Sequence, residues 1–202
     1  MTLRDHLFDA LRTDPVTAPL WNAGFRVRIG ASACLAGEKV RPDGSDCRSN
    51  AVSVVLPLVA EVVSLCPEVA IGLGVPRPAM QRVRLAAGHE AVRSVEAHAT
   101  DITARLDGFA TDVVRSRIFH GYVFKARSAS CAPGNAPLFD EHGVQIGLAG
   151  GRYAEHLRRA FPRAPMCDEE ALVTMGSLAR FVMACYRYAA SLPAEGIEPP
   201  TH

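Results

Sequence analysis

Three cysteines stand directly after apolar runs that resemble β-strands: Cys34 after residues 25–30, Cys66 after residues 62–65 and Cys131 after residues 122–124. Strands that alternate with helical segments usually run parallel, and their carboxyl ends meet along one edge of the sheet. We therefore expect three thiols that are far apart in the sequence to converge. Three thiolates leave a metal or cluster with an open position, which is typical of catalysis rather than of a structural site.

Polar residues lie within a few positions of each cysteine: Ser32 near Cys34, Glu68 near Cys66, and Lys125, Arg127, Ser128 and Ser130 near Cys131. Cations and backbone amides near a thiol lower its pKa and favour the thiolate that metals bind. The sequence thus predicts a metal centre with a carboxylate and hydroxyl groups beside it.

The elements that must position these residues alternate between strands and helices. We expect strands at residues 25–30, 121–127 and 164–167, a helix running into a strand over residues 51–63, and a β-hairpin over residues 83–95. Helices are predicted over residues 101–118, 153–161 and 169–190, and loops over residues 31–50, 66–78 and 128–137. The predicted fold is one three-layer α/β/α, Rossmann-like domain with a mostly parallel sheet and a small β-hairpin.

We divide the chain into a helical preface at residues 1–24, the α/β domain at residues 25–191 and a mobile Pro- and Glu-rich tail at residues 192–202.

The composition is that of a globular protein. The chain has 202 residues, of which 49% are hydrophobic, and a formal net charge of +1. Its basic residues are scattered, so no broad surface for nucleic acid is expected. No apolar run reaches the length of a membrane span, and residues 1–10 carry charges where a signal peptide needs an apolar core. Six cysteines without a secretory signal indicate a reducing compartment, and we expect a cytoplasmic protein.

The three cysteine segments resemble the thiouracil desulfurase family. Members of that family show a Ser-Ala-Cys-Leu-x-Gly stretch, a Cys-Pro-Glu stretch and an Arg-Ser-x-Ser-Cys stretch in this order. This chain has all three, at residues 32–37, 66–68 and 127–131. Each stretch alone is a weak motif, whereas three in order at suitable spacing are specific, and the resemblance extends over residues 30–172.

The resemblance implies an iron–sulfur enzyme. By it, Cys34, Cys66 and Cys131 would hold a [4Fe-4S] cluster whose fourth iron binds the sulfur of the substrate. Glu68 would be the acidic catalytic residue and Ser128 the catalytic serine. The implied reaction is the non-redox desulfuration of a thiolated pyrimidine, thiouracil or thiouridine, to the oxo base and hydrogen sulfide.

The chemistry implied by the resemblance is physically reasonable. A soft metal centre suits a soft thiocarbonyl sulfur and polarises the C=S bond. Glu68 would orient or deprotonate water, and Ser128 would hydrogen-bond the substrate or relay a proton. We expect Ser32 and Ser130 to contact the substrate.

Cys47 leaves other interpretations open, because it lies in a loop near Cys34. As a fourth ligand it would close the site, which would then be an iron–sulfur or metal-binding sensor without turnover. The same three cysteines could instead hold zinc in a hydrolase. Ala129 and Ala132 stand where the family commonly has Pro and Gly, and Ala132 would restrict the turn if its backbone needed a positive φ.

The expected partner is a small thiolated nucleobase or nucleoside, with no membrane association. Some relatives act on thiolated uridine in transfer RNA, so a 4-thiouridine desulfurase acting on tRNA is the alternative activity. Those relatives often carry a further domain, which this sequence lacks, and the net charge is near zero. We therefore expect the free base or nucleoside to be the substrate.

Overall fold

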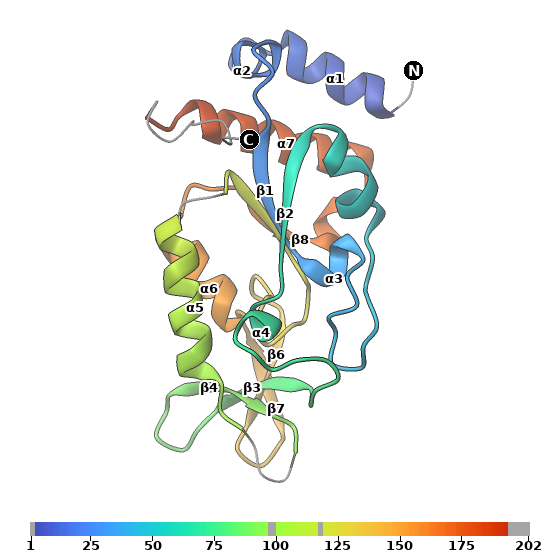
Figure 1. Cartoon of the computed structure of the whole chain (residues 1–202). Helices are drawn as coiled ribbons and strands as arrows, with labels where there is room; N and C mark the ends of the chain where they lie inside the picture. The colour runs from blue at the N-terminus through green and yellow to red at the C-terminus, as the bar shows by residue number, and fades with distance from the viewer. Residues whose placement is uncertain (1–2, 97–99, 117–118, 194–202) are drawn as a thin grey trace.

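A four-stranded parallel sheet forms the centre of the fold (Figure 1). The structure is a computed structural model and describes residues 3–96, 100–116 and 119–193. The strands of this sheet follow the order β2 (Ala60–Leu65), β1 (Val27–Ser32), β5 (Gly121–Phe124) and β8 (Met166–Asp168). β1 pairs in parallel with β2 along its whole length and with β5 on its other side. The carboxyl ends of these strands therefore meet at one edge.

Helices cover both faces of this sheet (Figure 1). Successive side chains of a strand point to opposite faces, so the strands feed two cores. Ile29 of β1 packs in the core that holds side chains of α1 (Leu3–Thr13) and α7 (Met175–Ala190). Tyr122 and Phe124 of β5 pack instead against the other pair of helices, α5 (Thr103–Ser116) and α6 (Arg152–Ala160). Leu7 and Leu11 of α1 are fully buried in the first core, so α1 packs directly on the domain.

A second four-stranded sheet lies beyond the carboxyl edge of the first, at the bottom of Figure 1. Its order is β4 (Glu90–Ser94), β3 (Met80–Arg84), β6 (Ala136–Asp140) and β7 (Gln145–Ala149). β3–β4 and β6–β7 are antiparallel hairpins, and β3 pairs with β6 in parallel. Gly143, at φ +82°, closes the second hairpin, and the Asp140 carboxylate accepts hydrogen bonds from two backbone amides of that turn.

The remaining helical segments are short: α2 (Ala18–Asn22), α3 (Ala33–Ala36), the π-helical turn η1 (Ala51–Val55), the 3₁₀ turns η2 (Leu56–Leu58) and η3 (Glu169–Leu172), and α4 (Pro67–Ala70). α3 and α4 each begin where a central strand ends. Within the described residues, no helix is long and apolar enough to cross a membrane.

The predicted fold class is confirmed, because a parallel sheet with helices on both faces forms the body of the molecule. The hairpin expected over residues 83–95 is present as β3–β4, and the segment 51–63 does run from helical turns into β2. Of the tail expected at residues 192–202, everything from residue 194 onward lies outside the described residues.

Three segments differ from expectation. The loop predicted over residues 128–137 runs into β6, so the second sheet has four strands rather than two. The loop predicted over residues 66–78 contains α4, because Pro67 suits the first turn of a helix. The helix predicted over residues 169–190 begins only at Met175, because Asp168 caps the short turn η3 and Thr174 then forms a capping box with Ser177.

Candidate active site

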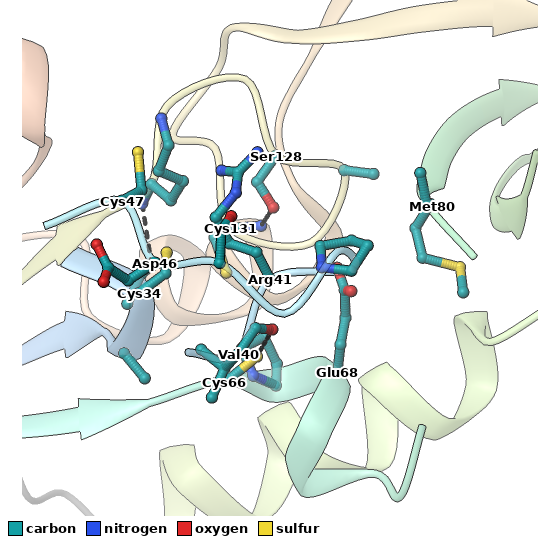
Figure 2. Close-up of a pocket in the computed structure, with 18 of the residues that line it drawn as sticks. Cys34, Val40, Arg41, Asp46, Cys47, Cys66, Glu68, Met80, Ser128 and Cys131 are labelled. Atoms are coloured by element: carbon teal, nitrogen blue, oxygen red, sulfur yellow. Dashed lines mark hydrogen bonds between the residues drawn. The ribbon is translucent and has the colours of Figure 1, made fainter. Parts of the chain in front are cut away.

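The three candidate ligands lie at the carboxyl ends of three adjacent strands. Cys34 is in α3, directly after β1, and Cys66 is the N-cap residue of α4, directly after β2. Cys131 follows β5 in the loop that leads to β6. In Figure 2 the sulfur atoms of these three residues face a common space. The predicted convergence of the three thiols is therefore present.

This space is a cavity of about 630 Å³ between the two sheets. Its wall includes Cys34, Cys66 and Cys131, and also Glu68, Ser32 and Ser128. Met80 of β3 forms part of the wall as well, so the second sheet helps to enclose the site. All the predicted site residues except Ser130 line this cavity.

The surroundings of the three thiols raise their pKa values. Burial, together with the nearby Cys47 and Cys66, raises the pKa of Cys34 to about 11. Burial also raises the pKa of Cys66, and it raises the pKa of Cys131 well above its usual range, although a hydrogen bond with Ser32 acts in the opposite direction. A cation or cluster that binds here must displace three protons, and its positive charge offsets the cost of burying the thiolates.

Glu68 is a buried carboxylate at the cavity wall. Only 8% of the residue is exposed, and α4 places it one residue after Pro67. Its Oε2 accepts a hydrogen bond from Arg77 Nε at 2.8 Å, and its Oε1 accepts one from Ser130 Oγ at 2.8 Å. An acidic group that faces the cavity is thus held from behind by two residues.

The three predicted serines have different surroundings. Ser128 Oγ accepts the backbone N–H groups of Cys131 at 3.1 Å and of Ser130 at 3.3 Å, so its hydroxyl proton is available to a cavity occupant. Ser32 Oγ accepts the Lys125 N–H at 3.0 Å and links β1 to the end of β5. Ser130 is fully buried and donates to Glu68.

The helix α6 supports the third ligand. The N–H groups at its start donate to carbonyls of the Cys131 loop: Arg152 to Ala129 at 3.0 Å, Tyr153 to Ser130 at 2.9 Å and Gly151 to Ala132 at 2.7 Å. A Cβ on Gly151 would lie 2.5 Å from backbone atoms of that loop, so only glycine permits this approach. Ala132 does not have a positive φ, and alanine therefore suits its position.

Cys47 also contributes to the cavity wall, and its N–H donates to the Cys34 carbonyl at 3.0 Å. Its side chain points away from the space that the other three thiols face (Figure 2). Within the described part of the chain, no three His, Cys, Asp or Glu side chains are grouped so as to hold a single metal ion.

Two arginines that were not predicted as site residues also belong to the site. Arg77 lies in the irregular segment after α4, and its side chain is only 4% exposed. Arg41 lines the cavity, and within the described residues its guanidinium has no hydrogen-bond or ion-pair partner. The position of Arg41 beside the Cys34 motif was the available indication, whereas nothing local in the sequence marks Arg77 as buried.

Comparison with known proteins agrees with this site. One similar solved structure is described as a [4Fe-4S]-dependent thiouracil desulfidase, TudS; it is 27% identical, with a TM-score of 0.53, over 73% of this chain and 93% of the other. No curated protein matches the chain. Residues 29–169 match the 2-thiouracil desulfurase family, which is more than half of the sequence and includes all three cavity cysteines. The chain therefore belongs to the 2-thiouracil desulfurase family.

Proposed function

We propose that this protein is a [4Fe-4S]-dependent thiouracil desulfidase, which replaces the sulfur of a thiolated pyrimidine by oxygen. The observation that carries the proposal is the convergence of Cys34, Cys66 and Cys131 on one cavity, with the carboxylate of Glu68 in its wall. Family membership and the likeness to TudS support it.

The residues present fit an iron–sulfur cluster. Cysteine thiolates are the usual ligands of such clusters, and three of them come here from three separate segments around a cavity of about 630 Å³. Cys47, the fourth thiol in the wall, points elsewhere. We assign Cys34, Cys66 and Cys131 as the ligands, which leaves one iron for the substrate.

The cluster would supply a soft Lewis acid that draws electron density from the C=S bond. The remaining work belongs to residues of this chain. Glu68 holds a water molecule and accepts its proton, because each carboxylate oxygen keeps a free lone pair beside the hydrogen bond that it already accepts. The water oxygen bonds to the carbon of the thiocarbonyl group, and the C–S bond breaks.

Hydroxyl groups orient the substrate. Ser128 donates its proton to the pyrimidine ring, because its oxygen is already fixed by two backbone amides. Ser32 also lines the cavity and contributes a second polar contact. The reaction balances as C=S plus water giving C=O plus hydrogen sulfide, so no electron donor or acceptor is needed and the activity is that of a hydrolase.

The substrate proposed is a thiolated pyrimidine base or its nucleoside, which includes thiouridine. The cavity volume of about 630 Å³ lies in the range of small-molecule sites, and hydroxyl, carboxylate and guanidinium groups in its wall can bind the polar edge of one ring. The setting proposed is the cytoplasm, because the six cysteines are free thiols and an iron–sulfur site needs reducing conditions.

The test is anaerobic reconstitution with iron and sulfide, followed by iron and sulfide counting, visible absorption and an assay of sulfide release from 2-thiouracil and 4-thiouracil. We expect about four irons per chain and release of one sulfide per oxo base. Stoichiometric zinc without iron would favour the zinc hydrolase. A full cluster without turnover of any thiolated pyrimidine would favour the sensor.

A further inference from the structure

Glu68 is held at both carboxylate oxygens by side chains that solvent scarcely reaches. Ser130, which is fully buried, donates to Oε1, and the Arg77 side chain, 4% exposed, donates to Oε2. Both distances are 2.8 Å. The carboxylate plane is therefore fixed, and the lone pairs that remain face away from these two donors.

Arg77 is itself anchored to two loops. Its Nη1 donates to the Gly74 carbonyl at 2.9 Å and its Nη2 to the Val40 carbonyl at 2.8 Å. With Nε on Glu68, every nitrogen of the guanidinium is engaged. Lysine cannot reproduce this set, because its single ammonium lacks the planar fork of arginine.

The same guanidinium contacts a proposed cluster ligand. Arg77 Nη2 lies 3.9 Å from Cys66 Sγ, which is within the range of hydrogen bonds to sulfur. One side chain thus contacts both the carboxylate that would activate water and a sulfur that would bind iron. Hydrogen bonds to ligand sulfurs are among the factors that set the reduction potential of an iron–sulfur cluster.

We propose that Arg77 and Ser130 are positioning residues that fix Glu68 from its two oxygens, and that Arg77 also tunes the cluster through its contact with the Cys66 sulfur. The proposal rests on the proposed function for its catalytic part, whereas the contact with sulfur is independent of turnover. The sequence predicted that Ser130 contacts the substrate. Because Ser130 is fully buried and donates to Glu68, we assign it the positioning role instead.

Substitutions of Ser130 and Arg77 should have different effects on kcat and on the reduction potential of the cluster. Ser130→Ala removes one hydrogen bond to Glu68 and leaves the sulfur contact intact. We expect kcat per cluster to fall about 10- to 100-fold, with little change in KM, because a displaced catalytic group loses about that much. The cluster potential should not move. Arg77→Gln should lower kcat similarly and also lower the cluster potential, because a donor to the ligand sulfur is lost.

Arg82→Gln is the matched control. Arg82 is also a buried arginine, 1% exposed at the side chain, that donates to a carboxylate, Glu90, at 2.7 Å. It lies on β3 and does not line the cavity. Its replacement should lower thermal stability while kcat per cluster and the potential stay at wild-type values. Arg77→Lys, which keeps the charge, provides the measurement if Arg77→Gln does not fold.

Measurements on the wild-type protein distinguish failure of the proposed function from failure of the positioning role. A wild-type protein that binds the cluster but turns over no thiolated pyrimidine would sink the proposed function, while the potential of the Arg77 variants would still decide the sulfur contact. A wild-type protein that binds no cluster would sink both. Folded Arg77 variants with unchanged potential and unchanged kcat per cluster, or a Ser130→Ala variant with unchanged kcat, would overturn the positioning role.

Discussion

The six cysteines of this chain are all free thiols, yet they occupy two kinds of environment. Cys34, Cys66 and Cys131 line the cavity. Cys185 is fully buried on α7 against Gly121, in the first core. The same residue type therefore provides ligands at the strand ends and packing in the helix.

Alanine substitution should separate these roles. Cys34→Ala, Cys66→Ala or Cys131→Ala should abolish binding of a full cluster, because each removes one of three ligands. Cys185→Ala should retain the cluster and lose only about 1 kcal/mol of stability, because it leaves a small void in the core. Iron counting and visible absorption measure the first effect, and thermal unfolding measures the second. A full cluster in Cys66→Ala would contradict the ligand assignment.

Glu68→Gln should keep the cluster but lose turnover. The amide is similar in size to the carboxylate but cannot accept the proton of water, and general base catalysis typically contributes on the order of 10²- to 10⁴-fold. The assay is sulfide release per cluster. Turnover at the wild-type rate would return Glu68 to a structural role.

Cys47→Ala should leave cluster content and turnover near wild-type values. Its side chain points away from the other three thiols, so it supplies no ligand at the open iron. Iron counting before and after the substitution checks this. Loss of the cluster would mean that the fourth position is filled and would support the sensor.

At the scale of elements, α6 controls the position of Cys131. Gly151→Ala should displace the loop, because its Cβ would lie 2.5 Å from the backbone of Ser130, Cys131 and Ala132. Such overpacking costs about 1–3 kcal/mol, and we expect a lower unfolding temperature and less cluster per chain.

Gly134→Ala is the control for this substitution. Gly134 lies in the same loop, and a Cβ there would meet no atom within 4 Å. It should therefore change neither stability nor cluster content by much. Equal cluster content in the Gly151 and Gly134 variants would show that α6 does not position the ligand.

Features of the fold and of the site that follow from local sequence patterns could be predicted, whereas those that depend on contacts between distant parts of the chain could not. The convergence of Cys34, Cys66 and Cys131 follows from a local pattern of strand ends together with the rule for parallel sheets. The sequence predicted that both Ser128 and Ser130 act at the substrate, because both hydroxyls occupy one loop and only its turn decides which of them faces the cavity.

Contacts between residues that are far apart in the sequence were the hardest to predict. The burial of Arg77 depends on Val40 and Gly74, which belong to two different loops. β6 and β7 were missed because Pro137 and Gly147 weaken their strand pattern and because β6 gains its place by pairing with the distant β3.

For the whole molecule, charge argues for a small substrate. The net charge is +1, and Lys125 and Arg127, two cations at the cavity, are ion-paired with Glu169 and Glu170. Binding of tRNA depends on many phosphate contacts and weakens steeply as salt rises. Of the four cationic residues that line the cavity, only Arg41 has no ion pair within the described residues.

We therefore expect sulfide release from 4-thiouracil and 4-thiouridine to change little between low and moderate salt. Thiolated tRNA, assayed alongside, should be the poorer substrate. A much higher kcat/KM on the tRNA that falls sharply with salt would contradict this expectation and favour the tRNA activity.

The origin of the ligands in three different strands has a consequence for how the protein matures. No short segment of the chain contains two of them, so the cavity forms only after β2, β1 and β5 have paired. Two extensive apolar cores lie on opposite faces of that sheet. We therefore expect the chain to fold before iron and sulfide bind, and a chain that has lost its cluster to bind a new one on reconstitution.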